Sequence, residues 1–169
     1  DSIRLAAADL GLAVPTFEQA SHVIGLGLAD ALRLTVPDLP RDRLQEYIAR
    51  YRVHYVAREA QLAPFPGITD LLRDLAGRPP WLAIATGKSR AGLNAALSKT
   101  DWGGHFVTTR CADEGAPKPD PWMLRDICEE LGVAPGRAVM IGDTTHDLAM
   151  ARAAGAASVA VTYGAHDPD

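Results

Sequence analysis

Two aspartates lie four residues apart in the stretch GDTTHD, which spans residues 142–147. The apolar run at 138–141 predicts a buried strand of a parallel sheet, and the apolar residues that recur after the stretch predict a helix. Asp143 then leaves the end of the strand and Asp147 follows one helical turn later, so both carboxylates can face one pocket. Such oxygen ligands beside a helix N-terminus suit Mg²⁺ that holds a phosphate. A capped turn with a solvated surface acid is the simpler alternative.

Two further polar groups stand at the ends of predicted strands. Thr86 closes the apolar run 81–86, and the N–H groups of Gly87 and Lys88 at the following helix start can form a nest for phosphate oxygens. Lys118 lies in a loop that neighbouring prolines stiffen. Thr86 alone is also compatible with a plain strand-end hydroxyl, and Lys118 with a surface lysine. A hydroxyl, a lysine and two carboxylates at one sheet edge together fit phosphoryl transfer.

Composition limits the partners that we expect. The net charge of −4 argues against a nucleic acid or an anionic membrane surface as the partner. No apolar run approaches the length of a membrane span. Cys111 and Cys128 form neither a CxxC pair nor a disulfide framework, which favours a reducing compartment and therefore the cytoplasm.

The first 64 residues contain no convincing strand and predict a small helical bundle. The apolar spacing and the capping residues predict helices at about 4–12, 17–25, 28–34 and 42–62. Because the first helix is much shorter than the last, we expect residues to be missing between Ile3 and Arg4. The PFPG sequence at 64–67 marks the best domain boundary.

From residue 65 onward, predicted helices and strands alternate. The strands are expected at about 81–86, 106–109, 138–141 and 157–161, separated by helices. Ser89, Asp120 and one of Thr144 and Thr145 are expected to cap helices, and Gly155 to end the last one. This alternation predicts an α/β domain with a parallel sheet and right-handed crossovers.

Two features of the helical part leave alternatives open. The GLG sequence at 25–27 is similar to the start of a dinucleotide-binding motif, but no strand precedes it, so that interpretation fails. The segment is either a plain turn or a turn whose free N–H groups face a ligand. The arginines of the long helix either attract an anionic substrate or form a solvated face.

Taken together, these motifs resemble those of the haloacid dehalogenase-like (HAD) phosphohydrolases, specifically the subgroup that contains the phosphoglycolate phosphatases. Thr86 in IATGK matches the strand-end Thr or Ser of the second family motif, and Lys118 in KPDP matches the lysine of the third. Residues 142–147 match the fourth motif, GDxxxD. The resemblance covers essentially the whole chain. It implies a doubly wound, Rossmann-like α/β core over 65–169, and a helical cap over 1–64 inserted after the first strand of the core.

The resemblance also implies a role for each matching residue. Asp143 would bind Mg²⁺ directly, and Asp147 would support the metal through a water or by orienting Lys118. Thr86 and the Gly87 N–H would bind phosphoryl oxygens, while Lys118 would neutralise charge on the nucleophile and the phosphate. Cap-side contacts to the substrate are expected from three residues: His22, Gly25 and Gly27. His146 is expected to point away from the metal.

The activity implied is a two-step, Mg²⁺-dependent hydrolysis of a small phosphorylated metabolite of the phosphoglycolate type. A phosphomutase of the same family would share the aspartyl-phosphate intermediate. A 2-haloacid dehalogenase needs no metal, and two carboxylates without a cation would repel its carboxylate substrate. The non-enzymatic alternative is a protein that binds phosphate or a partner. The sequence leaves the oligomeric state open.

The first family motif, a strand that ends in DxDGT, has no match in this sequence. It carries the nucleophilic Asp and the general acid, and in the family an Asp-Ser pair like Asp1-Ser2 usually follows it. Without that central strand, two buried strand edges would be unpaired, at about 1–3 kcal/mol per backbone group. We therefore expect the natural protein to contain an N-terminal strand and a further C-terminal segment. An intact mass of only 18.0 kDa for a folded sample would contradict this expectation.

Overall fold

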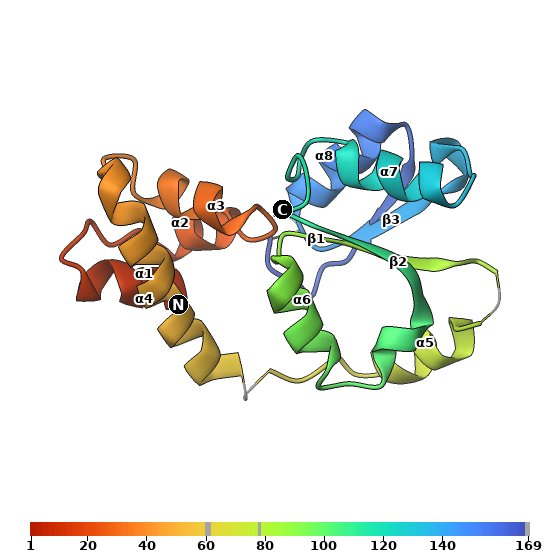
Figure 1. The fold of residues 1–169 in the computed structure, drawn as a ribbon, viewed down its shortest axis with the longest axis horizontal. Coiled ribbons are helices and arrows are strands. Elements are labelled where there is room, and N and C mark those ends of the chain that lie inside the picture. The colour runs from red at the N-terminus through yellow and green to blue at the C-terminus, as the bar shows by residue number, and fades with distance from the viewer. Residues whose placement is uncertain (60–61, 78, 168–169) are drawn as a thin grey trace.

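The structure, a computed structural model, describes residues 1–59, 62–77 and 79–167. Figure 1 shows a helical N-terminal part beside a part in which helices flank parallel strands. The last turn of the predicted helix at 42–62 includes residues 60 and 61, which lie outside the described residues, as do residues 78, 168 and 169.

Local capping explains where the second helix of the N-terminal part begins. The Thr16 hydroxyl accepts a hydrogen bond from Gln19 N, and the Gln19 side chain accepts one from Thr16 N, as the capping box predicted. The second helix ends at His22 rather than near 25, and Gly25 takes a positive φ of 98°. The elements are α1 (Ser2–Asp9), α2 (Phe17–His22), α3 (Leu28–Thr35), the 3-10 turn η1 (Arg41–Arg43) and α4 (Leu44–Glu59).

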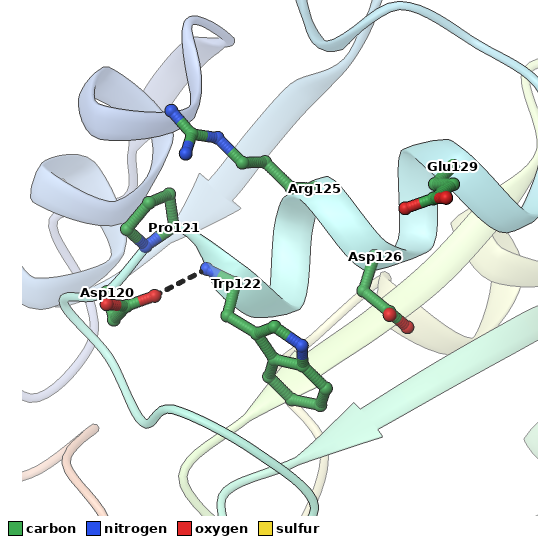
Figure 2. Close-up of a pocket in the computed structure, with 6 residues that line it drawn as sticks. All are labelled: Asp120, Pro121, Trp122, Arg125, Asp126 and Glu129. Carbon is green, nitrogen blue, oxygen red and sulfur yellow. Dashed lines mark hydrogen bonds between the residues drawn. The ribbon is translucent and has the colours of Figure 1, made fainter.

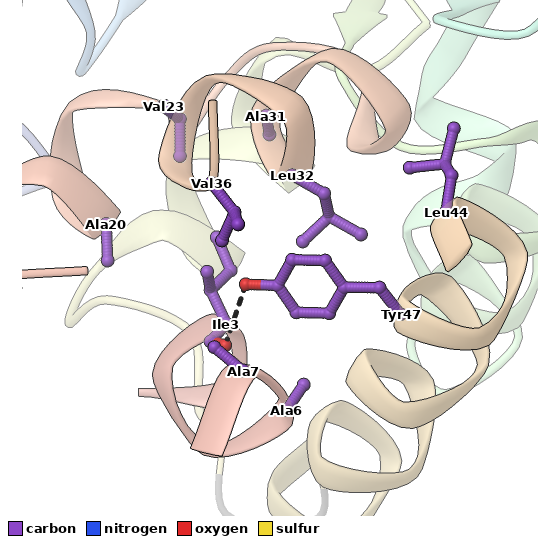
Figure 3. Close-up of a cluster of buried hydrophobic side chains, with 10 residues drawn as sticks. All are labelled: Ile3, Ala6, Ala7, Ala20, Val23, Ala31, Leu32, Val36, Leu44 and Tyr47. Carbon is purple, nitrogen blue, oxygen red and sulfur yellow. Dashed lines mark hydrogen bonds between the residues drawn. The ribbon is translucent and has the colours of Figure 1, made fainter. Parts of the chain in front are cut away.

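An apolar cluster holds these helices together, and Tyr47 of α4 lies at its centre (Figure 3). Tyr47 is fully buried, and its hydroxyl donates a hydrogen bond of 3.1 Å to the Ile3 carbonyl of α1. The buried hydroxyl of Tyr47 therefore has a hydrogen-bond partner. Helix α1 passes through Ile3 and Arg4 without a break, so the expectation of missing residues there stays a prediction.

The rest of the chain alternates between helix and strand as predicted. Its elements are α5 (Ile68–Leu75), β1 (Leu82–Thr86), α6 (Arg90–Leu97), η2 (Trp102–His105), β2 (Phe106–Cys111), α7 (Trp122–Glu130), η3 (Pro135–Arg137), β3 (Val139–Gly142), α8 (Thr145–Ala154) and β4 (Ala157–Ala160). Ser89 and Thr144 cap α6 and α8, and Gly155 ends α8 with a φ of 82°. Helix α7 begins one residue later than predicted, with Asp120 Oδ1 accepting a hydrogen bond from Trp122 N.

The strands form two separate parallel pairs, β1 with β2 and β3 with β4. Ala85 of β1 and Met140 of β3 both pack against the apolar cluster of α7 and α8, so the two pairs lie in one layer beneath these helices (Figure 1). Within the described residues, β1 and β3 each have one paired edge and one unpaired edge. The predicted parallel direction is confirmed, but the sheet is split in two.

One face of the β3–β4 pair is also uncovered. Val139 and Ile141 of β3 are 55% and 63% exposed, and Val159 of β4 is 49% exposed. On the opposite face, Met140 packs under α7 and α8. Parallel sheets normally have both faces covered by helices or other segments. The exposed face of β3 and β4 is therefore an apolar surface of a type that is usually buried. None of the helices in the described part of the chain is long and apolar enough to span a membrane.

Candidate functional site

The predicted catalytic groups come from loops at the carboxyl ends of three parallel strands. Thr86 ends β1, Lys118 follows β2, and Asp143 follows β3. Asp147 lies in the first turn of α8, and its Oδ1 accepts a hydrogen bond of 2.5 Å from Lys118 Nζ. Both side chains are buried, with 6% and 4% of their surface exposed. The structure therefore brings residues 29 positions apart into one ion pair.

The other carboxylate oxygen of Asp147 is occupied as well. Oδ2 accepts hydrogen bonds from Thr144 N at 3.2 Å and from Thr144 Oγ1 at 2.7 Å, so Asp147 completes the capping box of α8. A Cβ at position 142 would lie 2.4 Å from Asp147 Cβ, which explains why this position is a glycine. In this arrangement Asp147 orients Lys118. Its predicted role as a metal ligand stays a prediction.

Asp143 has a different environment. Its Oδ2 accepts a hydrogen bond of 2.8 Å from Ala165 N, and its backbone carbonyl accepts one of 3.2 Å from His166 N. Among the described residues no hydrogen bond engages Oδ1, and no group of three or more His, Cys, Asp or Glu side chains is arranged to hold a metal ion. Mg²⁺ commonly uses one or two carboxylates together with water and substrate phosphate. The available oxygen of Asp143 fits such a site as a single protein ligand.

The loop after β1 is fixed by its backbone. Thr86 Oγ1 accepts a hydrogen bond of 3.2 Å from Lys88 N, and the Lys88 carbonyl accepts one of 3.0 Å from Ala112 N in the loop after β2. A Cβ on Gly87 would lie 2.5 Å from the Gly25 carbonyl oxygen and 2.6 Å from that of Leu26. Only a glycine therefore allows the N-terminal part to approach this loop so closely.

All three predicted cap residues lie against core loops. The His22 carbonyl is 2.8 Å from Nε2 of His146 in α8. A Cβ on Gly25 would lie 2.9 Å from Thr144 Oγ1, whereas one on Gly27 would make ordinary contacts of 3.6 Å with side chains of the loop after β2. The segment from 22 to 27 thus contacts the loops after β1, β2 and β3. Its contact with a substrate stays a prediction.

Two side-chain contacts near the site were not predicted from the sequence, and the Lys88 N–H that was predicted to face a phosphate donates to Thr86 Oγ1 instead. His166 Nδ1 accepts a hydrogen bond from Thr145 N at 3.1 Å, and its ring lies 5.4 Å from that of His22 and 5.3 Å from that of His146. Burial and these two neighbouring imidazoles hold the pKa of His166 below its ordinary value. Lys88 Nζ donates a hydrogen bond of 2.6 Å to the hydroxyl of Tyr55 in α4. Both contacts join distant segments, which no local sequence pattern indicates.

A surface depression of about 310 Å³ lies along α7, away from these groups (Figure 2). Its wall contains none of the predicted site residues. Three of its side chains are carboxylates, which would repel an anionic substrate. We therefore do not assign the site to this depression, whose lining residues are Asp120, Pro121, Trp122, Arg125, Asp126 and Glu129.

Comparison with known proteins identifies the family. The profile of the haloacid dehalogenase-like hydrolases matches residues 1–161, and the chain therefore belongs to this family. It is 36% identical over 154 residues to a protein from Dickeya dadantii named "Probable phosphatase IndB", covering 86% of this chain and 66% of that protein. It is 30% identical over 166 residues to a phosphoglycolate phosphatase from Agrobacterium fabrum, covering 95% of this chain and 71% of that enzyme.

A solved structure gives the same result for the fold. The crystal structure titled as a putative phosphoglycolate phosphatase from Lactobacillus plantarum superposes with a TM-score of 0.82 at 25% identity, covering 99% of this chain and 79% of that one. The predicted family and subgroup, the α/β fold and the hydrolase class are therefore confirmed. The chain spans about two thirds of the length of the Dickeya relative. The predicted domain boundary and the roles of the site residues stay predictions.

The buried ion pair predicts unequal effects for the two aspartates. Asp147→Ala leaves the Lys118 ammonium buried without its partner, so we expect the free energy of unfolding to fall by about 3–5 kcal/mol. The matched variant Asp143→Ala removes a partly exposed carboxylate and should cost about 1 kcal/mol. Urea unfolding of the full-length protein in EDTA measures both. Equal losses for the two variants would contradict the assigned geometry.

Proposed function

We propose that the protein is a phosphatase that hydrolyses a small phosphomonoester of the phosphoglycolate type with Mg²⁺. The observation that carries the proposal is the Lys118–Asp147 ion pair, which fixes a buried cation at the edge of the sheet where Thr86 and Asp143 also lie. The names of the Dickeya and Agrobacterium relatives support a phosphatase activity.

Lys118 would supply positive charge to the transferring phosphoryl group. One of its three N–H donors is engaged by Asp147, and the other two, which have no further hydrogen bond within the described residues, would donate to phosphoryl oxygens. Because the ammonium is buried, its attraction to a developing negative charge is stronger than it would be in water. The Thr86 hydroxyl and the Gly87 N–H would donate hydrogen bonds to other phosphoryl oxygens at the end of β1.

Asp143 would hold the Mg²⁺ ion through Oδ1, the carboxylate oxygen that accepts no hydrogen bond from the described part of the chain. When bound, the ion would supply Lewis-acid stabilisation of charge on the phosphoryl oxygens. Asp147 would keep Lys118 oriented rather than bind the metal directly, since both of its oxygens accept hydrogen bonds from the protein.

The nucleophile would come from outside this sequence. The family resemblance implies an Asp at the end of a strand that precedes Asp1, and the unpaired edges of β1 and β3 are suitable neighbours for it. Its carboxylate oxygen would form a bond to phosphorus while the ester oxygen leaves as the alcohol with a proton from a general acid. Water would then cleave the acyl phosphate, releasing phosphate and regenerating the carboxylate.

The cap would exclude bulk water from this reaction. The backbone of Gly25 and Leu26 lies directly against Gly87, next to the proposed phosphate loop. Such close approach would restrict the site to a small substrate and would keep other water away from the intermediate. The protein would have no nucleic-acid or membrane partner and would function in the cytoplasm.

Two related activities remain as alternatives. A phosphomutase would transfer the phosphoryl group between positions of a sugar phosphate, which assays with sugar phosphates distinguish. A 2-haloacid dehalogenase would release chloride without a metal. Asp143 argues against the dehalogenase, because its free carboxylate oxygen would repel a carboxylate substrate unless a cation lay between them.

The proposal predicts that the full-length protein hydrolyses p-nitrophenyl phosphate with Mg²⁺ and loses this activity in EDTA. Asp143→Ala should abolish turnover, and Lys118→Ala should lower kcat by a factor on the order of 100 or more, because it removes a buried positive charge from the proposed phosphate site. Nitrophenolate release measures these rates. Activity that survives both EDTA and Asp143→Ala would exclude the mechanism.

A further inference from the structure

Among the residues that the structure describes, the ammonium of Lys88 has no acidic partner. Within the described residues, its side chain contacts the hydroxyl of Tyr55, and no carboxylate lies within ion-pair distance. Lys118, by contrast, is neutralised by Asp147. Lys88 is only half-buried, so water can stabilise its charge in the free protein. A half-buried cation without a carboxylate partner can bind an anion without first breaking an existing ion pair.

The backbone of Lys88 is held in place on both sides. Its N–H donates to Thr86 Oγ1, and its carbonyl accepts from Ala112 N in the loop after β2. The next residue, Ser89, caps α6 by accepting a hydrogen bond from Gly92 N at 3.2 Å. The side chain therefore starts from a rigid position, two residues after the threonine of the proposed phosphate loop.

The other half of the contact comes from the cap. The Tyr55 hydroxyl accepts a hydrogen bond of 2.6 Å from Lys88 Nζ, which also lies 4.9 Å from the centre of the Tyr55 ring. The ring stacks on Tyr51 at 5.7 Å. Burial, with Tyr55 close by, raises the pKa of Tyr51 to about 12, so this second phenol adds no negative charge. Because Tyr55 accepts from Lys88, its own O–H proton remains available to an anion.

We propose that Lys88 and Tyr55 form a two-sided anion subsite that binds a carboxylate of the substrate beside the phosphate site. This inference rests on the proposed phosphatase function and adds the second group by which the substrate is recognised. Lys88 would supply the charge from the core and Tyr55 a hydrogen bond from the cap, so a carboxylate bound here would connect the two parts of the protein.

The Lys88–Tyr55 pair lies beside the proposed phosphate loop, so the carboxylate and the phosphate group of one substrate would bind near each other. Lys88 lies two residues beyond Thr86, and the backbone of Gly25 and Leu26 closes over Gly87 between them. The ligand that we assign to the subsite is a compact substrate with one carbon between the carboxylate and the phosphate ester oxygen, since the lysine follows the proposed phosphate loop directly in the chain. The subsite would therefore favour a 2-phosphonooxy carboxylate over an alkyl phosphate of the same size that lacks the carboxylate.

The test compares phosphoglycolate with ethyl phosphate, which has a methyl group in place of the carboxylate, in the full-length enzyme. Removing a charged hydrogen-bond donor with Lys88→Met should lower the ratio of kcat/KM values, phosphoglycolate over ethyl phosphate, by about 10- to 100-fold. Most of the change should be in KM for phosphoglycolate. Tyr55→Phe removes only the hydroxyl and should lower the ratio by roughly 2- to 10-fold.

Two controls separate recognition from a general loss of structure. Lys88→Arg keeps the charge and should retain most of the preference, whereas Lys99→Met makes the same substitution at an exposed lysine and should leave the ratio unchanged. The subsite would be overturned if the wild-type enzyme showed no preference for phosphoglycolate. It would also be overturned if Lys88→Met lowered kcat/KM equally for both substrates. Absence of wild-type activity on either substrate and on p-nitrophenyl phosphate would instead refute the proposed function.

Discussion

The buried ion pair between Lys118 and Asp147 is the constraint on which the rest of the site depends. Lys118 follows β2 and Asp147 lies in the helix after β3, so the pair connects the two halves of the divided sheet. Burying both charges has a desolvation cost that only good geometry offsets. Thr144 supplies the additional hydrogen bonds that this geometry needs. The same contacts that join the halves also aim a cation at the strand ends where Thr86 and Asp143 lie.

The cap depends on the core in a different way, through backbone packing at glycines rather than through charge. Gly87 admits the carbonyls of Gly25 and Leu26, and Gly25 itself lies against Thr144. A side chain at either glycine would separate the two parts. Around this close contact, polar groups from both parts meet, as with Lys88 and Tyr55. The contact between the N-terminal helices and the α/β part therefore combines close backbone packing with polar side chains from both parts.

Features set by nearby residues were predictable from the sequence. The caps at Thr16, Ser89 and Thr144 and the end of α8 at Gly155 agree with the structure, because each depends on residues within one or two turns. Contacts between distant segments were not predictable in this way. Strand β2 extends to Cys111, beyond the predicted end at 109, because it pairs with Thr86 of β1. Spacing placed Asp147 one helical turn after Asp143 but did not indicate a contact with Lys118; only the family resemblance suggested that Asp147 orients this lysine, as the structure shows.

The central claim is that Thr86, Lys118 and Asp143 form one phosphate site beside a central strand that this sequence does not include. The most direct measurement is a crystal structure of the full-length protein with Mg²⁺ and tungstate, a mimic of phosphate. We predict an added strand between β1 and β3, and the anion within hydrogen-bond distance of Thr86 Oγ1 and Lys118 Nζ while Lys118 keeps its contact with Asp147. An anion bound elsewhere, or β1 and β3 paired directly with each other, would contradict this account.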